Sequence, residues 1–262
     1  MKVYVMVDME GISGVVLPEQ VSGTGEYERA RKYITDDANA CVEGCFNGGA
    51  TDVLVVDAHW RGFSIHWDLF DSRATLSQGR SHHLDGRMHS IAEYDALILL
   101  GYHAMAGTPG AVLEHTMTSK GWQNLWINGR LAGEIAIDAG IAGDAGVPTI
   151  MASGCDKACK EAQDWMPGIH PAVVKTGLGT TGAELLGRTK AHDLIRRTAE
   201  TACKNYKSIK PLVHNKPLTM RLELVERGTP PQTIGGRSYL KIIDGRTYEV
   251  QGKTTIEALA RL

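Results

Sequence analysis

The chain of 262 residues is long enough to bury a sizeable core, and its length fits one domain or two. Hydrophobic residues at 43% and charged residues at 22% indicate a globular protein rather than a disordered one. The formal net charge of -2 excludes a general attraction to nucleic acid or to an anionic membrane, and no apolar run reaches the about 20 residues of a membrane-spanning helix. Small molecules are therefore the expected ligands.

The start of the chain and its cysteines predict a cytoplasmic protein. MKVYVMVD has one lysine and a short apolar run with acids directly behind it, which is unlike a secretory signal. Five cysteines, an odd number without a dense framework, are unlike a disulfide-stapled secreted domain. Cys41 and Cys45 stand four residues apart, as do Cys155 and Cys159, and this differs from the C-x-x-C spacing of metal and redox motifs. We interpret both pairs as buried residues on helix faces.

Short apolar runs alternate with helical patterns in the first part of the chain. Near-continuous apolar runs predict strands at 2–8, 52–59, 94–103 and 148–154. Helical patterns lie between and after them, at 27–49, 133–147 and 155–165. Asn128-Gly129, within the segment 123–130, is a strong turn signal. This order predicts an α/β fold, a three-layer α/β/α domain with a largely parallel sheet.

The pattern changes after Pro167. A predicted strand at 170–177 precedes a long amphipathic helix at 183–206. Two alternating, half-exposed strands and a closing helix follow, at 219–226, 246–252 and 254–262. We therefore expect the three-layer domain to span 1–167 and a smaller C-terminal α+β two-layer domain to span 168–262.

Two acidic residues follow the first predicted strand, in the stretch VMVDMEGISG. Side chains two apart in an extended chain point to the same face, so Asp8 and Glu10 converge on one point if the strand geometry continues through them. Two uncompensated carboxylates repel each other, and a bound cation removes that conflict. Acids are also common in surface loops after strands, so this pair alone does not establish a metal site.

Histidines follow two further strands. DVLVVDAH ends in His59 and ALILLGYH ends in His103, at the sheet edge where ligand crevices form in open α/β folds. A single histidine after a strand is usually a surface or capping residue, whereas two in equivalent places beside an acidic pair favour a shared site. Glu134, at the start of the helix GEIAIDAG, is either a further carboxylate ligand or a favourable acid in the first helical turn.

These residues form a set of three carboxylates and two imidazoles, enough for two divalent ions that share one bridging carboxylate. The set is Asp8, Glu10, His59, His103 and Glu134. Mixed imidazole and carboxylate ligands suit Zn²⁺ better than Mg²⁺, which prefers oxygen ligands. Two zinc ions about 3.5–4 Å apart can lower the pKa of a bridging water and polarise a carbonyl, so the set predicts a hydrolase.

A further histidine, His115, follows the glycine-rich stretch GYHAMAGTPG by a few residues. Beside a metal pair, its imidazole can donate to an oxyanion or pass a proton to a leaving amine. The alternative is a packed or solvated histidine without a catalytic role. The sequence pattern alone leaves both interpretations open.

With these residues assembled, the chain resembles the D-aminopeptidase (DppA-type) family of dinuclear zinc aminopeptidases. The stretches that carry the resemblance are VDMEGISG, VVDAHW, LGYHAMAGTPGAVLEHTM and INGRLAGEIAIDAG, spread across most of residues 1–150. The resemblance implies that the five residues of the set bind two zinc ions per subunit, with Asp8 as the bridge. It also implies that His115 is the catalytic histidine. We expect an acid/base or oxyanion role for it, because a metal-bound hydroxide is a better nucleophile than a neutral imidazole.

The resemblance further implies the reaction and the assembly. We expect a zinc-dependent aminopeptidase that hydrolyses the N-terminal residue, D or L, from short peptides by means of a bridging water. Relatives form a ring-like homo-oligomer with active sites facing an internal space, and a decamer is one size that the resemblance allows. Two segments depart from the family pattern: GRSHHLDGRMHS, with His82, His83 and His89, and the segment around 227–237. The three histidines are either extra zinc ligands or, as we favour, incidental members of a polar loop.

Two other function classes remain open. Paired acids after a buried strand also describe metal-dependent phosphohydrolases, although that class usually has an Asp-x-Asp pair where this chain has Asp8-Met9-Glu10. A non-enzymatic peptide-binding protein is the second alternative, and it would be expected to carry an export signal. The aminopeptidase remains the favoured function.

Overall fold

A computed structural model describes residues 1–23, 25–79, 87–228, 230–231 and 237–262. Its larger sheet has seven strands in the order β3-β2-β1-β4-β7-β8-β9. In that order the strands are Thr75–Ser77, Asp52–Asp57, Lys2–Val7, Ala96–Tyr102, Thr149–Cys155, His170–Gly179 and Gly182–Leu185. Every pair is parallel except β8 with β9, which is antiparallel. The C-terminal ends of β1, β2, β4 and β7 therefore meet at one edge of the sheet.

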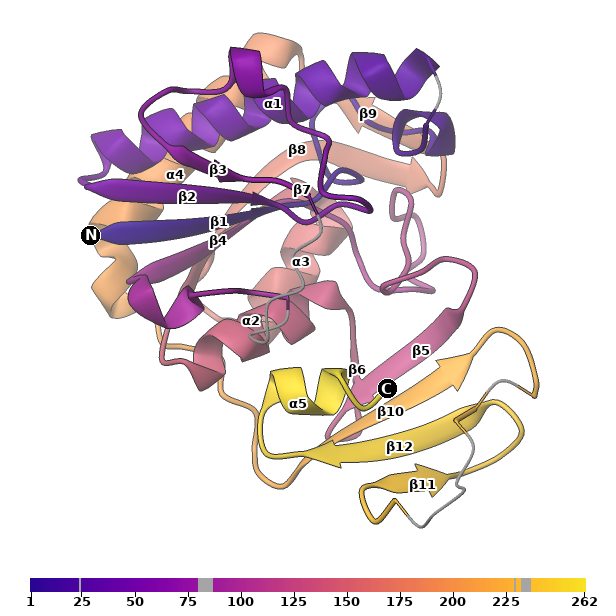
Figure 1. The fold of residues 1–262 in the computed structure, drawn as a ribbon. Coiled ribbons are helices and arrows are strands. Elements are labelled where there is room, and N and C mark those ends of the chain that lie inside the picture. The colour runs from indigo at the N-terminus through magenta and orange to yellow at the C-terminus, as the bar shows by residue number, and fades with distance from the viewer. Residues whose placement is uncertain (24, 80–86, 229, 232–236) are drawn as a thin grey trace.

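Helices cover both faces of this sheet (Figure 1). The long helices α1 (Gly25–Asn47) and α4 (Arg188–Asn205) pack against each other on one face, and α2 (Glu134–Asp144) and α3 (Asp156–Trp165) lie on the other. The central strands are fully buried, as in β4 with seven buried residues of seven. Their near-continuous apolar sequence is what a parallel sheet covered on both faces requires.

The second sheet has five antiparallel strands in the order β11-β12-β10-β5-β6. They are Leu240–Ile242, Thr247–Gly252, Leu218–Leu224, Trp122–Ile127 and Arg130–Ala132. The short helix α5 (Thr255–Leu259) contacts β10 and β12 on one side and α2 on the other, which joins this sheet to the larger layer system. The predicted turn at Asn128-Gly129 closes the β5–β6 hairpin, with φ of 50° and 82°.

The single-turn helices are η1 (Pro18–Gln20), η2 (Trp67–Leu69), η3 (Ile91–Glu93) and η4 (Tyr206–Ser208). Among the described helices, none combines the length and the apolar character that crossing a membrane requires.

The predicted fold class is confirmed: the chain combines a largely parallel sheet between helices with a smaller antiparallel sheet. The division at residue 167 stays a prediction. The larger sheet includes β8, which follows that residue, and the smaller sheet includes β5 and β6, which precede it, so each sheet takes strands from both sides of the division. The prediction of a helix at 183–206 is wrong at its start.

Residues Gly182–Leu185 form β9, which pairs with the open edge of β8, and the helix begins at Arg188. Pairing with a neighbouring strand overrides the local helix preference of Ala183-Glu184-Leu185.

Candidate metal centre

The proposed ligands lie at the C-terminal edge of the larger sheet. Asp8 and Glu10 follow β1, His59 follows β2 and His103 follows β4. Glu134 is the first residue of α2 and reaches the same edge. All five side chains are buried, with 2–8% of their surface exposed. The fold thus gathers the whole predicted set on the side of the sheet that the strand ends predict.

Asp8 and Glu10 meet this edge through a turn rather than through continued strand geometry. β1 ends at Val7, and the chain turns through Met9 and Glu10. The amide of Gly11 donates to the carbonyl of Gly101 at 2.7 Å, which lays the loop across the end of β4. A Cβ on Gly11 would lie 2.0 Å from the carbonyl oxygen of Tyr102, so the close approach requires a residue without a side chain.

His103 is at the centre of the cluster. Its Nε2 lies 3.3 Å from Oδ2 of Asp8 and 3.3 Å from Oε1 of Glu134. Two overlapping groups of three ligand atoms result, one of Asp8, Glu10 and His103 and one of His103, His115 and Glu134. His59 is in neither group and lies beside Glu10, with 3.5 Å between its Nε2 and Oε1.

Each of the three imidazoles is oriented by a contact of its Nδ1. Nδ1 of His103 lies 3.0 Å from the carbonyl oxygen of Ala104, and Nδ1 of His115 lies 2.9 Å from that of Leu113. Nδ1 of His59 lies 3.3 Å from Oγ of Ser64. Because a carbonyl oxygen only accepts hydrogen bonds, Nδ1 of His103 and of His115 carries a proton, and in the neutral ring Nε2 is the atom that offers a lone pair on the side of the carboxylates.

The backbone on either side of His115 is strained. Leu113 has φ of 48° and Met117 has φ of 60°, values that non-glycine residues rarely adopt. The result is that the amide of Met117 donates to Oε1 of Glu134 at 2.8 Å and the ring of His115 stacks on that of His103, with 4.0 Å between centroids. Nε2 of His115 lies 3.8 Å from Oε1 of Glu134. The structure therefore places His115 beside the proposed ligands.

Buried charges shift the pKa values of the cluster in opposite directions. Burial alone would raise the pKa of Asp8 and of Glu134, but the imidazole of His103, 3.3 Å from each carboxylate, outweighs it and lowers the pKa of Asp8 well below its usual range and that of Glu134 to about 2. Burial alone would lower the pKa of His103 and of His59. The carboxylates of Asp8 and Glu134 instead raise the pKa of His103, and Glu10 raises the pKa of His59 to about 9. The cluster therefore holds ionised carboxylates and attracts positive charge.

The donor atoms fit zinc. In the described part of the chain, Nε2 of His103 and Oε2 of Glu10 are buried without a hydrogen-bond partner, although buried polar atoms are normally paired. An ion coordinated by these atoms removes that cost. Neutral imidazole nitrogens with carboxylate oxygens are the ligand types that zinc takes in catalytic sites.

The cluster opens into a cavity of about 460 Å³. Its lining includes four of the proposed ligands and His115, and three further residues add apolar surface. The four ligands are Asp8, Glu10, His59 and Glu134, and the apolar residues are Val21, Trp60 and Met117. Trp60 has φ of 46° and half of its surface exposed. The volume and the mixed lining suit a small ligand with a polar centre and an apolar part.

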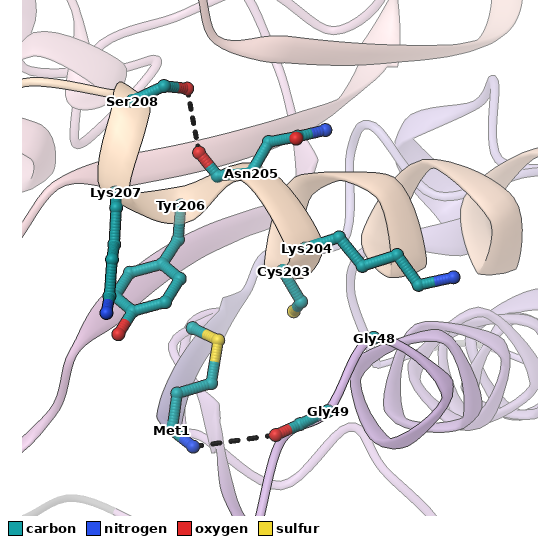
Figure 2. A pocket seen from close by; sticks show the side chains of 9 residues that line it. All are labelled: Met1, Gly48, Gly49, Cys203, Lys204, Asn205, Tyr206, Lys207 and Ser208. Atoms are coloured by element: carbon teal, nitrogen blue, oxygen red, sulfur yellow. Dashed lines mark hydrogen bonds between the residues drawn. The ribbon is translucent and has the colours of Figure 1, made fainter.

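A larger cavity, of about 610 Å³, lies at the opposite edge of the sheet, where β1 begins (Figure 2). Its lining is Met1, Gly48, Gly49 and the six residues from Cys203 to Ser208. The α-ammonium of Met1 lies 3.5 Å from the carbonyl oxygen of Gly49. No group of three metal-ligating atoms occurs there among the described residues, so chemistry rather than volume identifies the candidate site.

Several polar and charged residues around the cluster were not predicted from the sequence. Arg87 donates to Oε2 of Glu134 at 2.9 Å and to both oxygens of Asp138 at 2.6 and 3.0 Å. Tyr102 donates its hydroxyl to Oδ2 of Asp138 at 2.7 Å. Asp138 stands four residues after Glu134 on a helix whose other residues, apart from the final Asp144, are apolar or small, and this spacing was the available signal, because it puts both carboxylates on one face.

Two more buried ionisable residues come from the strand β8 and the helix α3. Lys175 on β8 is 1% exposed. A lysine inside the apolar strand AVVKTG was the available signal, because charged residues are rarely buried without partners. Glu161 on α3 accepts from the amide of Met105 at 2.7 Å, two residues after His103. The three histidines of the departing loop are tested only in part: His82 and His83 lie outside the described residues, and the ring of His89 packs edge-on against Tyr4.

Comparisons with known proteins identify the family. A family model described as D-aminopeptidase matches residues 1–262. A D-aminopeptidase of Bacillus subtilis (strain 168) is 35% identical over 236 residues, covering 87% of this chain and 83% of the relative. The structure is similar to that of the Zn-dependent D-aminopeptidase DppA from Bacillus subtilis, a self-compartmentalizing protease, with a TM-score of 0.91, 31% identity and coverage of 99% of this chain and 94% of that one. The chain therefore belongs to the D-aminopeptidase family.

Proposed function

We propose that this hydrolase is a zinc-dependent aminopeptidase that removes the N-terminal residue, D or L, from short peptides. The observation that supports it most directly is the convergence of His103 with Asp8 and Glu134, at 3.3 Å each, where both carboxylates line an open cavity. Zinc bound there supplies Lewis acidity, which lowers the pKa of water and polarises a scissile carbonyl.

We further propose two zinc ions per subunit. Asp8, Glu10, His59, His103 and Glu134 would hold them. The charge of Asp8 acts on all three nearby imidazoles, His103, His59 and His115, which supports Asp8 as the carboxylate shared by both ions. Glu10 with His59 and Glu134 with His103 then form the two flanking pairs.

His115 is proposed as the catalytic side chain. It lines the cavity, and Nδ1 is engaged by the carbonyl of Leu113, so Nε2 is the atom that faces a substrate. In the protonated state it can donate to the oxygen of the scissile carbonyl or to the leaving amine, and in the neutral state it can accept a proton. Its distance of 3.8 Å from Oε1 of Glu134 supports a role beside the metal ligands.

The fold relative is a self-compartmentalizing protease, and on that ground we propose a homo-oligomer for this chain, with a ring-like decamer as one size to test. We also propose a cytoplasmic location, since all five cysteines are free and buried, as in proteins of reducing compartments.

Metal analysis and a substrate panel test the proposal. The purified protein is expected to contain about two zinc ions per subunit and to release amines from D- or L-aminoacyl amides, with loss of activity after chelation and recovery on zinc addition. Hydrolysis of a chromogenic phosphate ester with Mg²⁺, and not of the amides, would favour the phosphohydrolase instead. Peptide binding without metal or turnover would favour the binding protein.

A further inference from the structure

The buried lysine on β8 makes contacts that the reaction chemistry does not use. Nζ of Lys175 lies 2.6 Å from the carbonyl oxygen of Glu10, 2.9 Å from that of Ile12 and 2.5 Å from that of Val15. An ammonium group has three N–H donors, so each of them meets one carbonyl. The three hydrogen bonds described for this ammonium group therefore all go to backbone carbonyls.

These three carbonyls belong to one irregular segment, the loop that follows β1 and carries Glu10. Loop carbonyls that point inward have no strand ladder to pair with, and a buried carbonyl without a donor costs about 1–3 kcal/mol. Lys175 donates to all three from a position 160 to 165 residues away in sequence, and only the carbonyl of Ile12 has a further described donor, the amide of Val15 at 3.2 Å. The loop thus closes around the ammonium group as a cage of carbonyl oxygens.

The same loop is held on its other side by β4. The amide of Gly11 donates to the carbonyl of Gly101 at 2.7 Å, and the amide of Asp8 donates to that of Leu100 at 2.9 Å. Contacts from β4 and from Lys175 therefore fix the backbone of Glu10 from two directions. Its side chain is left to reach Nε2 of His59, at 3.5 Å, with Oε2 buried and unpaired in the described structure.

We propose that Lys175 is a positioning residue of the metal centre: its ammonium group fills the carbonyl cage of the loop and so holds Glu10 where it can bind metal. The inference rests on the proposed function in one respect, the assignment of Glu10 as a ligand. Because Lys175 acts through the loop, its loss should weaken the ion bound by Glu10 and His59 more than the ion bound by His103 and Glu134.

The test is Lys175→Ala, read out as zinc affinity and stoichiometry by chelator competition in the absence of substrate. The variant is expected to bind one of its two zinc ions about 10- to 100-fold more weakly than the wild type, the usual effect of removing a group that orients a ligand. The substitution removes three methylenes and an ammonium group, so added propylammonium is expected to refill the cage and restore affinity. 1-Propanol, of the same size without the charge, should not.

Lys157→Ala is the matched control. Nζ of Lys157 also donates to a backbone carbonyl, that of Gly177 on β8 at 2.6 Å, and no hydrogen bond described for it reaches the loop. This variant should keep wild-type affinity at both zinc sites. If Lys175→Ala is recovered unfolded, Lys175→Met, which keeps an apolar stem and loses only the donors, replaces it under the same criterion.

Three outcomes separate the inference from the proposed function. Selective weakening of one site with propylammonium rescue supports the role of Lys175. Wild-type zinc affinity in the folded Lys175 variant overturns that role and leaves the proposed function intact. A wild-type protein that binds no zinc overturns the assignment of Glu10 as a ligand, and the inference fails with it.

Discussion

The ion pair between Arg87 and Glu134 leaves the two carboxylate oxygens of Glu134 with different partners. Nη2 of Arg87 donates to Oε2 of Glu134 at 2.9 Å, while Oε1 lies 3.3 Å from Nε2 of His103. The guanidinium group is anchored in turn by both oxygens of Asp138. The arrangement turns Oε1 of Glu134, which also accepts from the amide of Met117, towards the proposed metal position, while Arg87 holds Oε2.

Arg87→Met is therefore expected to weaken zinc binding by about 10- to 100-fold. It also leaves Asp138 buried without its cation, and breaking a buried ion pair costs about 3 kcal/mol of the free energy of unfolding. Arg87→Lys should be intermediate, because an ammonium group cannot span both carboxylates as a planar guanidinium does. Chelator competition and urea unfolding measure the two effects.

Arg73→Met is the control for this substitution. Arg73 also pairs with an aspartate, Asp71, but half of its side chain is exposed, so its loss should cost less than about 1 kcal/mol and leave zinc affinity unchanged. An Arg87→Met protein with wild-type zinc affinity would show that Glu134 does not depend on the guanidinium group.

His115→Ala separates catalysis from metal binding. The imidazole stacks on His103 and faces the cavity, and a group that transfers a proton or stabilises an oxyanion contributes about 10²- to 10⁴-fold to the rate. We expect kcat to fall by that factor while about two zinc ions per subunit remain bound. Steady-state kinetics with metal analysis of the same sample gives both values. Loss of one zinc ion would instead make His115 a ligand, and full turnover would remove it from the reaction.

The sequence predicted those site residues whose place follows from a general rule of the fold. Asp8, His59 and His103 each follow an apolar strand, and parallel strands bring such positions to one edge whatever the rest of the chain does. Lys175 and Arg87 could not be placed in this way. Lys175 meets the loop after β1 across 160 or more residues, and such a contact exists only once the strand order is known.

Local sequence preference does not decide the backbone at two points. Asp8 and Glu10 converge through a turn at Met9, and not through the continued strand geometry that would also bring them together. Residues Ala183–Leu185 have helix-favouring side chains but pair with β8, because an open strand edge gains more from a partner than a helix start gains from propensity.

Glu161 makes the stability of the protein depend on pH. Burial raises the pKa of its carboxyl from 4.5 to about 7, so the folded state favours the protonated form. A folded-state pKa above the unfolded value gives stability that is fully present below about pH 4.5 and is lost as the pH rises through 7. The loss amounts to roughly 3 kcal/mol.

Glu161→Gln, which resembles the protonated acid and keeps an acceptor for the amide of Met105, should remove this dependence. The free energy of unfolding of the metal-free variant is expected to exceed that of the wild type at pH 8 by roughly 3 kcal/mol more than it does at pH 4. Urea unfolding of both proteins at the two pH values provides the measurement. A difference that stays constant with pH would mean that Glu161 does not titrate in this range.

Gly101 fixes the approach of the Asp8 loop to β4 and should not tolerate a side chain. Its φ is +72°, and a Cβ there would lie 2.4 Å from the carbonyl oxygen of Asp8 and 2.4 Å from Cδ1 of Ile12. Gly146→Ala is the matched control, because Gly146 has a similar φ of +79° with no described atom within 4 Å of its Cβ position. The control substitution should cost about 1 kcal/mol of the free energy of unfolding, from backbone strain alone. Gly101→Ala adds the steric conflict and is expected to cost at least about 3 kcal/mol and to displace Asp8 from His103, with a loss of zinc affinity. Equal costs in thermal or urea unfolding for the two variants would show that the loop can move away from β4 without penalty.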